Sequence, residues 1–468
     1  MLRAHRVLHA QLKRYLWCSA LAAAGLLLAG NASWAAGKKS EPAVHLLSSV
    51  QVPVTDGNTT NGMYSYDISY VDQSTGVYFL ADRSNLAVES LSSLSILTQI
   101  RPNNGHAPFA GFTPCAVQPA GANDCAGPNG VVSVFPFLFV TDAPSRVLSF
   151  DLNSNPPKTV GECTTMAGEP TRADELAYDP ADHLILAINN AASPPFATLV
   201  KVDPATGALT CGTNIILDTA HSGVDAENGA EQPVWDPITK KFYLSIPQIG
   251  GNPTVGGVIR ISTTGTVEAT YTITFCSPAG LALGPQNPPH LLVGCNTIWA
   301  TDGSLWTGNA DRNTQTAAPQ YVIIDANGGI TANVLGAGVG DEVWFNKGDN
   351  HYYGAASGSN LAPNAITPAR SPNGIAATAP VNVSQGAATL DVIDAISETL
   401  DQRVPTLNVP AVLAASGDLN PHPAATAHSV AADGVTGNVF VPIGANNAVP
   451  NCLTGCITIY GRHDPDTD

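Results

Sequence analysis

The sequence predicts an all-β protein, a seven-bladed β-propeller whose ring is closed by an N-terminal strand in the last blade. Seven stretches share one pattern: an apolar strand of about five residues, a turn rich in Asp, Asn, Gly or Pro, and a second apolar strand. A third strand follows most of them. Modules of this kind, repeated at about 60 residues, are typical of propeller blades. The stretches begin at Tyr66, Asn129, Asp174, Glu231, Ala279, Asp341 and His428.

Both ends of the chain contribute to the predicted ring. The segment "VHLLSSVQVP" at 44–53 precedes the first hairpin and alternates like an outer strand. We expect it to complete the last blade, whose inner strands come from 428–460. Because no composition break suggests a linker, residues 36–468 are predicted to form a single propeller domain.

The first 35 residues have the features of a secretory signal peptide. Arg3, Arg6, Lys13 and Arg14 precede the apolar run "LWCSALAAAGLLLAG", and a small-x-small cleavage site ends at Ala35. A membrane anchor is the alternative, although the run is short for a spanning helix. We expect a secreted or periplasmic protein that has no membrane segment after cleavage.

Charge narrows the range of partners. Cleavage removes four of the 20 basic residues and leaves 16 against 37 acidic ones, a formal net charge of −21. Nucleic acid and anionic lipid both require basic surface, so neither is expected as a partner. A small molecule or saccharide at the mouth of the central channel suits the sequence better. The sequence does not indicate the oligomeric state.

Eight cysteines remain after cleavage, an even number for an exported protein. Cys452 and Cys456 flank a hairpin tip, Cys115 and Cys125 bracket a loop, and Cys276 and Cys295 fall on adjacent strands. Elimination then pairs Cys163 with Cys211. A zinc site is the weaker alternative, because paired CxxC units are absent.

The residue that begins each innermost strand should lie at one mouth of the channel. Carboxylates gathered there repel one another unless a positive charge lies among them, and a divalent cation would provide it. Mainly oxygen donors favour Ca²⁺ or Mg²⁺, whereas one histidine leaves room for Mn²⁺, Fe²⁺ or Zn²⁺. A purely structural polar lining is the alternative. The six predicted ligands are Asp67, Asn129, Asp174, Glu231, Asp341 and His428.

The next residue along each strand should point away from the channel unless the strand is bulged, so Glu175 and Glu342 are weaker candidates. Loops that lead to the same mouth bring further histidines, which are the usual proton carriers near neutral pH. An idle surface histidine is the alternative for each one. The loops contribute His106, Arg172, His221 and His422, and the catalytic candidates are His428, Asp341, His221 and His422.

Two short motifs resemble a known family. "EQPVWDPITKKFYLSI" and "GPNGVVSV" are similar to strand starts in the senescence-marker-protein and gluconolactonase group of metal-dependent propellers. That resemblance implies that Glu231 and Asn129 are metal ligands, with Asp341 or Asp174 as a third. The repeats also look similar to streptogramin-lyase-like and YVTN-repeat propellers.

Two functions from different classes follow. The first is an exported metal-dependent enzyme, a lactonase-like hydrolase in preference to a lyase, in which His428, His221 or His422 moves the proton. The second is a non-catalytic propeller that binds a glycan, peptide or protein. Motifs for serine-nucleophile hydrolysis, nucleotide binding and zinc proteolysis are absent from the sequence.

Overall fold

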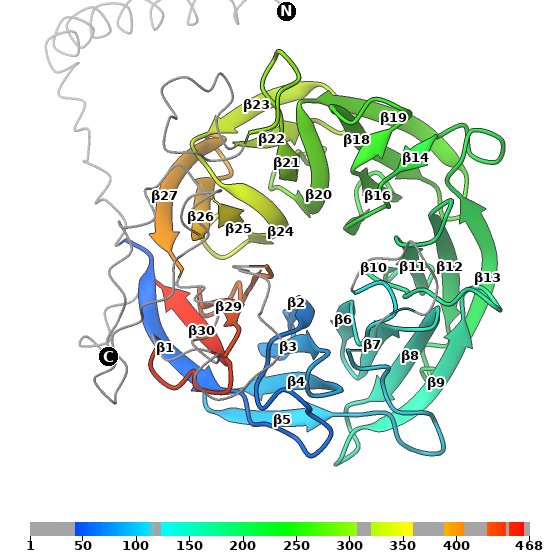
Figure 1. Cartoon of the computed structure of the whole chain (residues 1–468), viewed down its shortest axis with the longest axis vertical. Coiled ribbons are helices and arrows are strands. Elements are labelled where there is room, and N and C mark those ends of the chain that lie inside the picture. The colour runs from blue at the N-terminus through cyan, green and yellow to red at the C-terminus, as the bar shows by residue number, and fades with distance from the viewer. Residues whose placement is uncertain are drawn as a thin grey trace, which may run out of the picture. The chain divides into compact units, whose positions relative to one another are not determined.

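The computed structural model describes residues 43–112, 115, 123–306, 320–358, 388–406, 428–445 and 449–462. All regular structure in these ranges is β-strand, arranged in seven four-stranded sheets and one two-stranded sheet. The sheets follow one another around a common axis, with β2, β6, β10, β20 and β24 nearest the centre (Figure 1). The predicted all-β, seven-bladed propeller is therefore confirmed. The predicted signal peptide lies outside the described residues.

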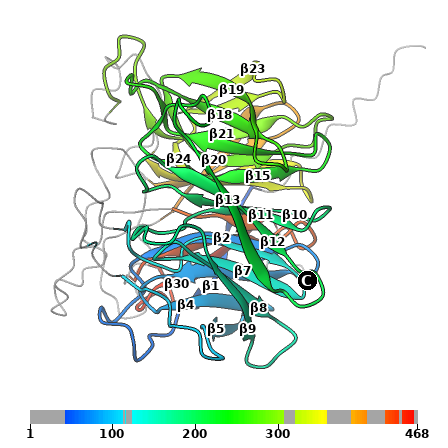
Figure 2. The same ribbon diagram turned by 90° about the vertical axis from the view of Figure 1, so that its right-hand side faces the viewer.

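Each sheet is one blade, and in blades 1 to 6 its strands run from the inside outward in chain order. Seen from the side, most of the labelled strands run across the narrow dimension of the ring (Figure 2). Blades 1 to 3 contain β2 (Tyr66–Asp72), β3 (Val77–Asp82), β4 (Ala87–Ser92), β5 (Ile96–Ile100); β6 (Val131–Val134), β7 (Phe137–Asp142), β8 (Arg146–Asp151), β9 (Lys158–Thr164); and β10 (Leu176–Asp179), β11 (Leu184–Asn189), β12 (Phe196–Val202), β13 (Leu209–Ile216).

The remaining blades follow the same plan, with one addition. The short strands β14 (Ala226–Glu227) and β17 (Gln248–Ile249) pair with each other beside blade 4. Blades 4 to 7 contain β15 (Pro233–Asp236), β16 (Lys241–Ile246), β18 (Val255–Ile261), β19 (Val267–Thr274); β20 (Cys276–Leu283), β21 (Leu291–Ile298), β22 (Gln320–Ile324), β23 (Ile330–Leu335); β24 (Val339–Asn346), β25 (His351–Gly358), β26 (Thr389–Asp394), β27 (Thr399–Pro405); and β28 (Ala431–Ala432), β29 (Val439–Ile443), β30 (Cys456–Gly461), β1 (His45–Gln51).

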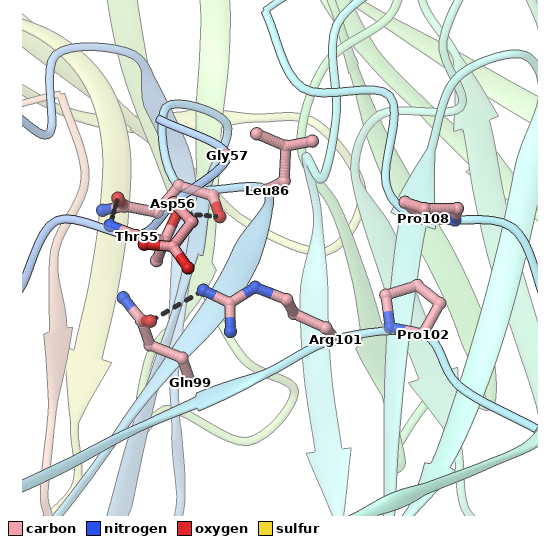
Figure 3. Close-up of a pocket in the computed structure, with 9 residues that line it drawn as sticks. Thr55, Asp56, Gly57, Leu86, Gln99, Arg101, Pro102 and Pro108 are labelled. Atoms are coloured by element: carbon pink, nitrogen blue, oxygen red, sulfur yellow. Dashed lines mark hydrogen bonds between the residues drawn. The ribbon is translucent and has the colours of Figure 1, made fainter. Parts of the chain in front are cut away.

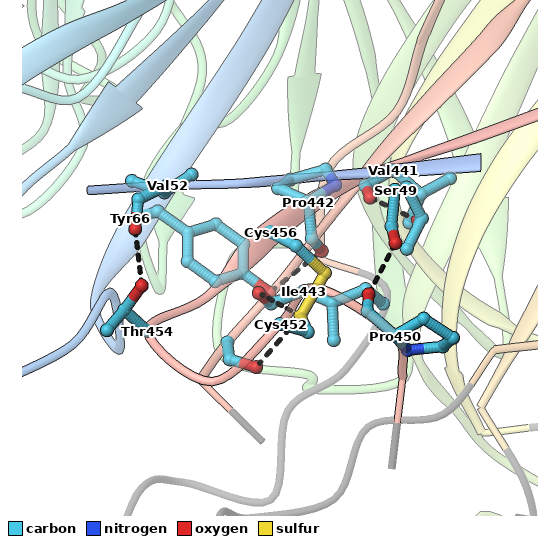
Figure 4. The surroundings of a disulfide bond; sticks show 12 residues. Ser49, Val52, Tyr66, Val441, Pro442, Ile443, Pro450, Cys452, Thr454 and Cys456 are labelled. Carbon is cyan, nitrogen blue, oxygen red and sulfur yellow. Dashed lines mark hydrogen bonds between the residues drawn. A yellow bond between two sulfur atoms is a disulfide. The ribbon is translucent and has the colours of Figure 1, made fainter. Parts of the chain in front are cut away.

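The ring closes in blade 7 as the sequence predicts. The N-terminal strand β1 pairs antiparallel with β30 and becomes the outer strand of that blade. Beyond the paired region, Thr454 Oγ1 donates to the carbonyl of Val52 at 2.6 Å, and the hydroxyl of Tyr66 donates to the carbonyl of Pro442 at 3.1 Å (Figure 4). Blades 1 and 7 are thereby joined by hydrogen bonds as well as by packing.

The turns explain why acidic residues recur at the ends of the inner strands. Asp72 ends β2, and its Oδ1 accepts hydrogen bonds from the backbone N–H groups of Ser74 and Thr75. Asp236 at the end of β15 accepts in the same way from Ile238 N at 2.8 Å. An Asp side chain that accepts from residues two and three positions ahead stabilises a tight turn. These aspartates therefore serve the fold.

Apolar side chains pack between neighbouring blades. Phe139 of β7 stacks on Tyr178 of β10, with ring centroids 5.5 Å apart, and so connects blades 2 and 3. Tyr78 of β3 stacks on Phe440 of β29 at 4.8 Å and connects blades 1 and 7. Since both faces of each sheet are covered, the apolar runs seen in the sequence belong to strands that are buried on both sides.

All four predicted disulfides are confirmed. The bond between Cys163 and Cys211 links the outer strands β9 and β13 of blades 2 and 3, and the bond shown in Figure 4 lies beside the ring closure. A protein with four disulfides is typical of an oxidising, extracellular type of compartment. Among the described residues, no helix is long and apolar enough to cross a membrane. The pairs are Cys115–Cys125, Cys163–Cys211, Cys276–Cys295 and Cys452–Cys456.

Candidate functional site at the acidic end of the ring

A repeated β-bulge shapes the start of the inner strands. In blade 3, Asp174 N donates to the carbonyl of Ile188, while Ile188 N donates to the carbonyl of Glu175, so two residues oppose one. Such a bulge changes the direction in which side chains point. The same arrangement pairs Asn129 and Gly130 with Thr141, and Glu231 and Gln232 with Ser245, and the register of β2, β20 and β24 skips likewise at 67–68, 279–280 and 341–342.

Each bulge contains two residues, such as Asp174 and Glu175, and we include the second residue in the site as well as the first. Strict alternation would point Glu175 and Glu342 away from the axis, yet each is only 4% exposed, and the charge of Glu342 acts on Glu175. We call this end of the ring the acidic end. It is defined by Asp67, Asn129, Asp174, Glu175, Glu231, Asp341, Glu342 and His428, together with Arg83 and Arg172.

Close backbone contacts hold neighbouring bulges at fixed spacing. A Cβ atom at Gly130 would lie 2.4 Å from the carbonyl oxygen of Asp174 in the next blade, and one at Gly280 would lie 2.1 Å from that of Asp341. Only glycine fits such an approach. The positions of Asp174 and Asp341 are therefore set by the backbone of the preceding blade.

The buried guanidinium of Arg83 pairs with the first acidic residue. Arg83 is 2% exposed; its Nη2 forms a salt bridge with Asp67 Oδ2, and its Nε donates to Asn129 Oδ1 at 2.9 Å. Burial alone would raise the pKa of Asp67, but the charge of Arg83 holds it well below its usual value. Asn129 donates its own amide hydrogens to the carbonyls of Ala126 and Ala173. Its side chain is thus fully hydrogen-bonded within the protein.

His428 bridges two carboxylates. Its Nε2 lies 2.8 Å from Asp67 Oδ1, and its Nδ1 lies 2.8 Å from Asp341 Oδ2. The other oxygen of Asp341 accepts from Asn296 Nδ2 at 3.1 Å. Burial would lower the pKa of His428, but the charges of Asp341 and Asp67 raise it well above its usual value. A carboxylate oxygen at each ring nitrogen favours the imidazolium form, which has an N–H donor on both sides.

Arg172 holds one oxygen of Asp174 and leaves the other without a partner. Arg172 Nη2 lies 2.8 Å from Asp174 Oδ2, Arg172 Nε donates to Asn190 Oδ1, and Arg172 Nη1 lies 3.9 Å from Asp67. Asp174 Oδ1 is buried and has no hydrogen-bond partner among the described residues. Burial raises the pKa of Asp174 to about 7, although Arg172 opposes the shift.

Three glutamates at this end lack such a cation. Glu175 and Glu342 are buried and Glu231 is half-buried, and no salt bridge joins them to a cation in the described ranges. Burial raises the pKa of Glu231 to about 8, assisted by the charges of Asp174 and Asp341. Burial also raises the pKa of Glu175 and of Glu342 well above their usual values. Six carboxyl groups thus face two guanidinium groups and one imidazole, an excess of acid groups that either protons or a bound cation must neutralise.

The six predicted metal ligands divide into two groups. The polar atoms of Asp67, Asn129, Asp341 and His428 already bind protein groups. In the described ranges, Asp174 Oδ1 has no hydrogen-bond partner and Glu231 forms no salt bridge. Across the residues that the structure describes, no three His, Cys, Asp or Glu side chains are already close enough to share an ion. Free carboxylate oxygens do suit a hard cation in chemistry, so Glu175, Glu231, Glu342 and Asp174 Oδ1 are the better donor set.

Of the predicted loop histidines, the structure places two elsewhere. His221 is 64% exposed at its side chain and binds Asp218 at 2.7 Å. His106 binds Glu162 at 2.6 Å. His422 lies outside the described residues. His428 is therefore the predicted catalytic histidine that the described structure brings to the acidic end.

Sequence reasoning missed the residue that organises this end. Arg83 follows β3 directly in "YFLADRSN", where it reads as an ordinary turn residue. A signal was nevertheless present. Arg83 follows the last residue of β3, and Asp67 is the second residue of β2, its hairpin partner, so the guanidinium can reach that carboxylate. The sequence placed Arg172 on the correct loop but gave it no partner.

A separate pocket of about 510 Å³ lies at the edge of blade 1 and contains none of the acidic-end residues (Figure 3). Its polar walls are largely bonded to one another. Thr55 N donates to Asn85 Oδ1 at 3.1 Å, and Arg101 Nη2 donates to Gln99 Oε1 at 2.7 Å. Because the unpartnered carboxyl groups gather at the acidic end, we place the candidate functional site there.

The fold and this site define a seven-bladed propeller with a buried polar centre at one end of its axis, and comparisons agree on the fold. No family model and no curated protein matches the chain. Among solved structures it is similar to a streptogramin B lyase structure, with a TM-score of 0.52 and 11% identity over 89% of this chain and 97% of that one. It is similar to a chain of a mitotic checkpoint complex at a TM-score of 0.51 and 11% identity, over 90% and 95%. Identities this low show the shared fold only.

Proposed function

We propose that the protein is an exported enzyme, a lactonase-like hydrolase that uses a divalent cation and acts on a small neutral ester or lactone at the acidic end. One observation carries the proposal: in the described ranges, Glu175, Glu231 and Glu342 gather there with no cation within salt-bridge distance, although the charges of Arg172 and His428 act on Glu231 and Glu342. Carboxyl groups buried in this way destabilise a fold, and proteins keep such arrangements chiefly at functional sites. Export is supported by the four disulfides and by the predicted signal peptide.

The proposed cofactor follows from the donor set. Carboxylate oxygens of Glu231, Glu175 and Glu342 would hold the ion, with Ca²⁺ favoured and Mn²⁺, Fe²⁺ or Zn²⁺ as alternatives, and Asp174 Oδ1 would remain free for proton transfer. When bound, such an ion polarises a carbonyl oxygen or lowers the pKa of a coordinated water molecule. Binding requires that these side chains turn toward one point, since they do not yet share one.

The protein groups supply proton transfer. As an imidazolium, His428 can donate a proton to the departing alkoxide oxygen when one of its two N–H groups leaves its carboxylate partner. Asp174, fixed at one oxygen by Arg172, can accept a proton from the attacking water at the other. Arg83 and Asp67 position the imidazole but take no proton, because the pKa of Asp67 is held far below neutrality.

A matched pair of histidine variants tests the proposal. Purified protein is assayed against a panel of lactones and esters, with calcium or manganese supplied. His428→Gln should abolish turnover while circular dichroism and the thermal midpoint show that the fold survives, and His221→Gln should retain full activity because that side chain is exposed and bound to Asp218. Equal activity in the two variants would exclude His428 from the reaction.

Heavy-oxygen water separates hydrolysis from elimination. A hydrolase incorporates the label into the product carboxylate, whereas a lyase does not. Turnover without incorporation would replace the hydrolase with a lyase. If no member of the panel is converted although the protein binds its ion, the alternative of a non-catalytic propeller that binds a glycan, peptide or protein gains support.

A further inference from the structure

A second pocket lies at the opposite end of the ring axis. It has a volume of about 290 Å³ and is lined by the turns in which the inner strands of blades 1, 4, 5 and 6 end. Asp67 is the second residue of β2 and Gln73 directly follows that strand, and six extended residues span about 20 Å. This pocket is therefore separate from the acidic end.

The walls are mainly apolar and held in place. Trp344 packs edge-on against Tyr70, with ring centroids 5.2 Å apart, and Phe345 packs against Tyr352 at 5.4 Å. Ile238 on the facing turn is 52% exposed, so an apolar surface remains uncovered there. Leu283, Pro237 and Pro289 complete the apolar lining. An apolar ring system matches such walls.

Two polar side chains of the pocket lining, Asp236 and Gln73, already form hydrogen bonds with the protein backbone. Asp236 accepts from Ile238 N and Thr239 N through its two oxygens. Gln73 donates to the carbonyl of Ala432 at 2.8 Å and accepts from Gly434 N at 3.0 Å. Neither side chain is therefore available to choose a ligand.

Lys347 is the exception. No carboxylate within the described part of the chain pairs with it, although the protein carries far more acidic than basic residues. Its stem packs on the backbone of blade 7, since a Cβ atom at Gly434 would lie 2.9 Å from Lys347 Cγ. One supported, unpaired ammonium group beside an apolar pocket is complementary to a single negative charge on an apolar body.

We infer that the opposite end binds a small aromatic monocarboxylate, with its ring between Trp344 and Ile238 and its carboxylate on Lys347. The pocket volume is at the small end of the range for ligand sites, which favours a ligand with one ring. The inference uses no residue of the acidic end and does not depend on the proposed activity.

The test is calorimetric titration of the full-length mature protein with sodium benzoate and with benzyl alcohol, its uncharged counterpart. We expect one saturable benzoate site. Lys347→Met should weaken benzoate binding by about tenfold or more and leave benzyl alcohol binding unchanged, because the variant removes only the charge. Ile238→Ser should weaken both ligands, since it removes apolar wall. Both residues are exposed, so neither variant endangers the fold.

Lys201→Met is the matched control. Lys201 is also exposed and pairs with no carboxylate of the described residues, but it lies on β12 of blade 3, outside the pocket, and should leave benzoate binding unchanged. The inference is overturned if benzoate does not saturate, or if Lys347→Met and Lys201→Met behave alike. It is also overturned if Glu231→Gln abolishes benzoate binding while Lys347→Met does not, because the ligand then occupies the acidic end.

Discussion

Asp67 and His428 lie 361 residues apart in the chain, yet Asp67 Oδ1 is 2.8 Å from His428 Nε2. Asp67 is in the first residues of β2, and His428 directly precedes blade 7, whose outer strand β1 comes from the N-terminal end. The contact therefore forms only when the ring is closed. Closure of the propeller and assembly of the candidate site are the same structural event.

Replacing Arg83 should unfold the protein more readily than replacing any exposed arginine. Arg83→Met leaves Asp67 buried with less positive charge and removes the donor to Asn129, so we expect a loss of about 3–5 kcal/mol in the free energy of unfolding. Arg101→Met, at an exposed position, should cost no more than about 1 kcal/mol. Urea unfolding of the two variants measures both losses of stability. Similar midpoints would show that the Arg83 network contributes no stability.

The salt bridges of Arg83 and Arg172 with Asp67 and Asp174 were not predicted from the sequence, whereas the fold was. The repeated hairpin, the segment 44–53 and the cysteine spacing each depend on local pattern or on ring topology, and all three predicted the structure. The column of rim residues was also found, because position in a repeat fixes position in a propeller. Which charges neutralise that column depends on side-chain reach across blades, and no periodicity reports it.

The β-bulges explain why the sequence predicted Glu175 and Glu342 only as weaker candidates. Alternation points Glu175 and Glu342 away from the channel unless the strand is bulged, and the sequence does not show the bulge. The hydrogen bonds of Ile188 to both Asp174 and Glu175 reveal it in blade 3, and the register shift between Gly340 and Val343 reveals it in blade 6. Gly130 and Gly280, at the second bulge position of their blades, were a usable signal. Glycine within a strand often marks a bulge or a close backbone approach.

The stability of the chelator-treated protein should fall as pH rises through neutrality. A carboxyl group with a folded-state pKa above its unfolded value stabilises the fold below the unfolded pKa, and that stability is lost as pH rises through the folded pKa. For Glu231 the window runs from its ordinary value of 4.5 to about 8. Glu231→Gln removes the titration, so at pH 8 we expect a gain of about 1–3 kcal/mol over the parent and no gain near pH 4.5.

Thermal melts across this pH range provide the measurement. Glu227→Gln is the control because Glu227 is exposed on β14, and its melting curve should follow that of the parent at every pH. If Glu231→Gln is no more stable than the parent at pH 8, Glu231 is not an uncompensated buried acid.

The disulfides should differ in their contribution to the free energy of unfolding, because they close loops of different length. Cys163 and Cys211 are 48 residues apart and join two blades, whereas Cys452 and Cys456 are 4 apart. Loop-closure entropy gives about 4 kcal/mol for the first and about 2 kcal/mol for the second. Alanine replacement of each pair, followed by denaturant unfolding, should rank them in that order. The reverse order would mean that the short bridge stabilises the ring closure directly.

Metal content is the sharpest test of the proposed cofactor. We expect about one divalent ion per chain by inductively coupled plasma mass spectrometry, because the excess of carboxyl groups at the acidic end attracts a cation that the two arginines cannot replace. The double variant Asp174→Asn with Glu231→Gln should lose the ion, while Glu227→Gln should retain it. In the parent, adding the ion back should also remove the fall in stability toward pH 8, since it neutralises the same groups. Protein that holds no ion after supplementation with calcium and manganese would require protons to supply the missing positive charge, and the reaction would then have to depend on Asp174 and His428 without a metal.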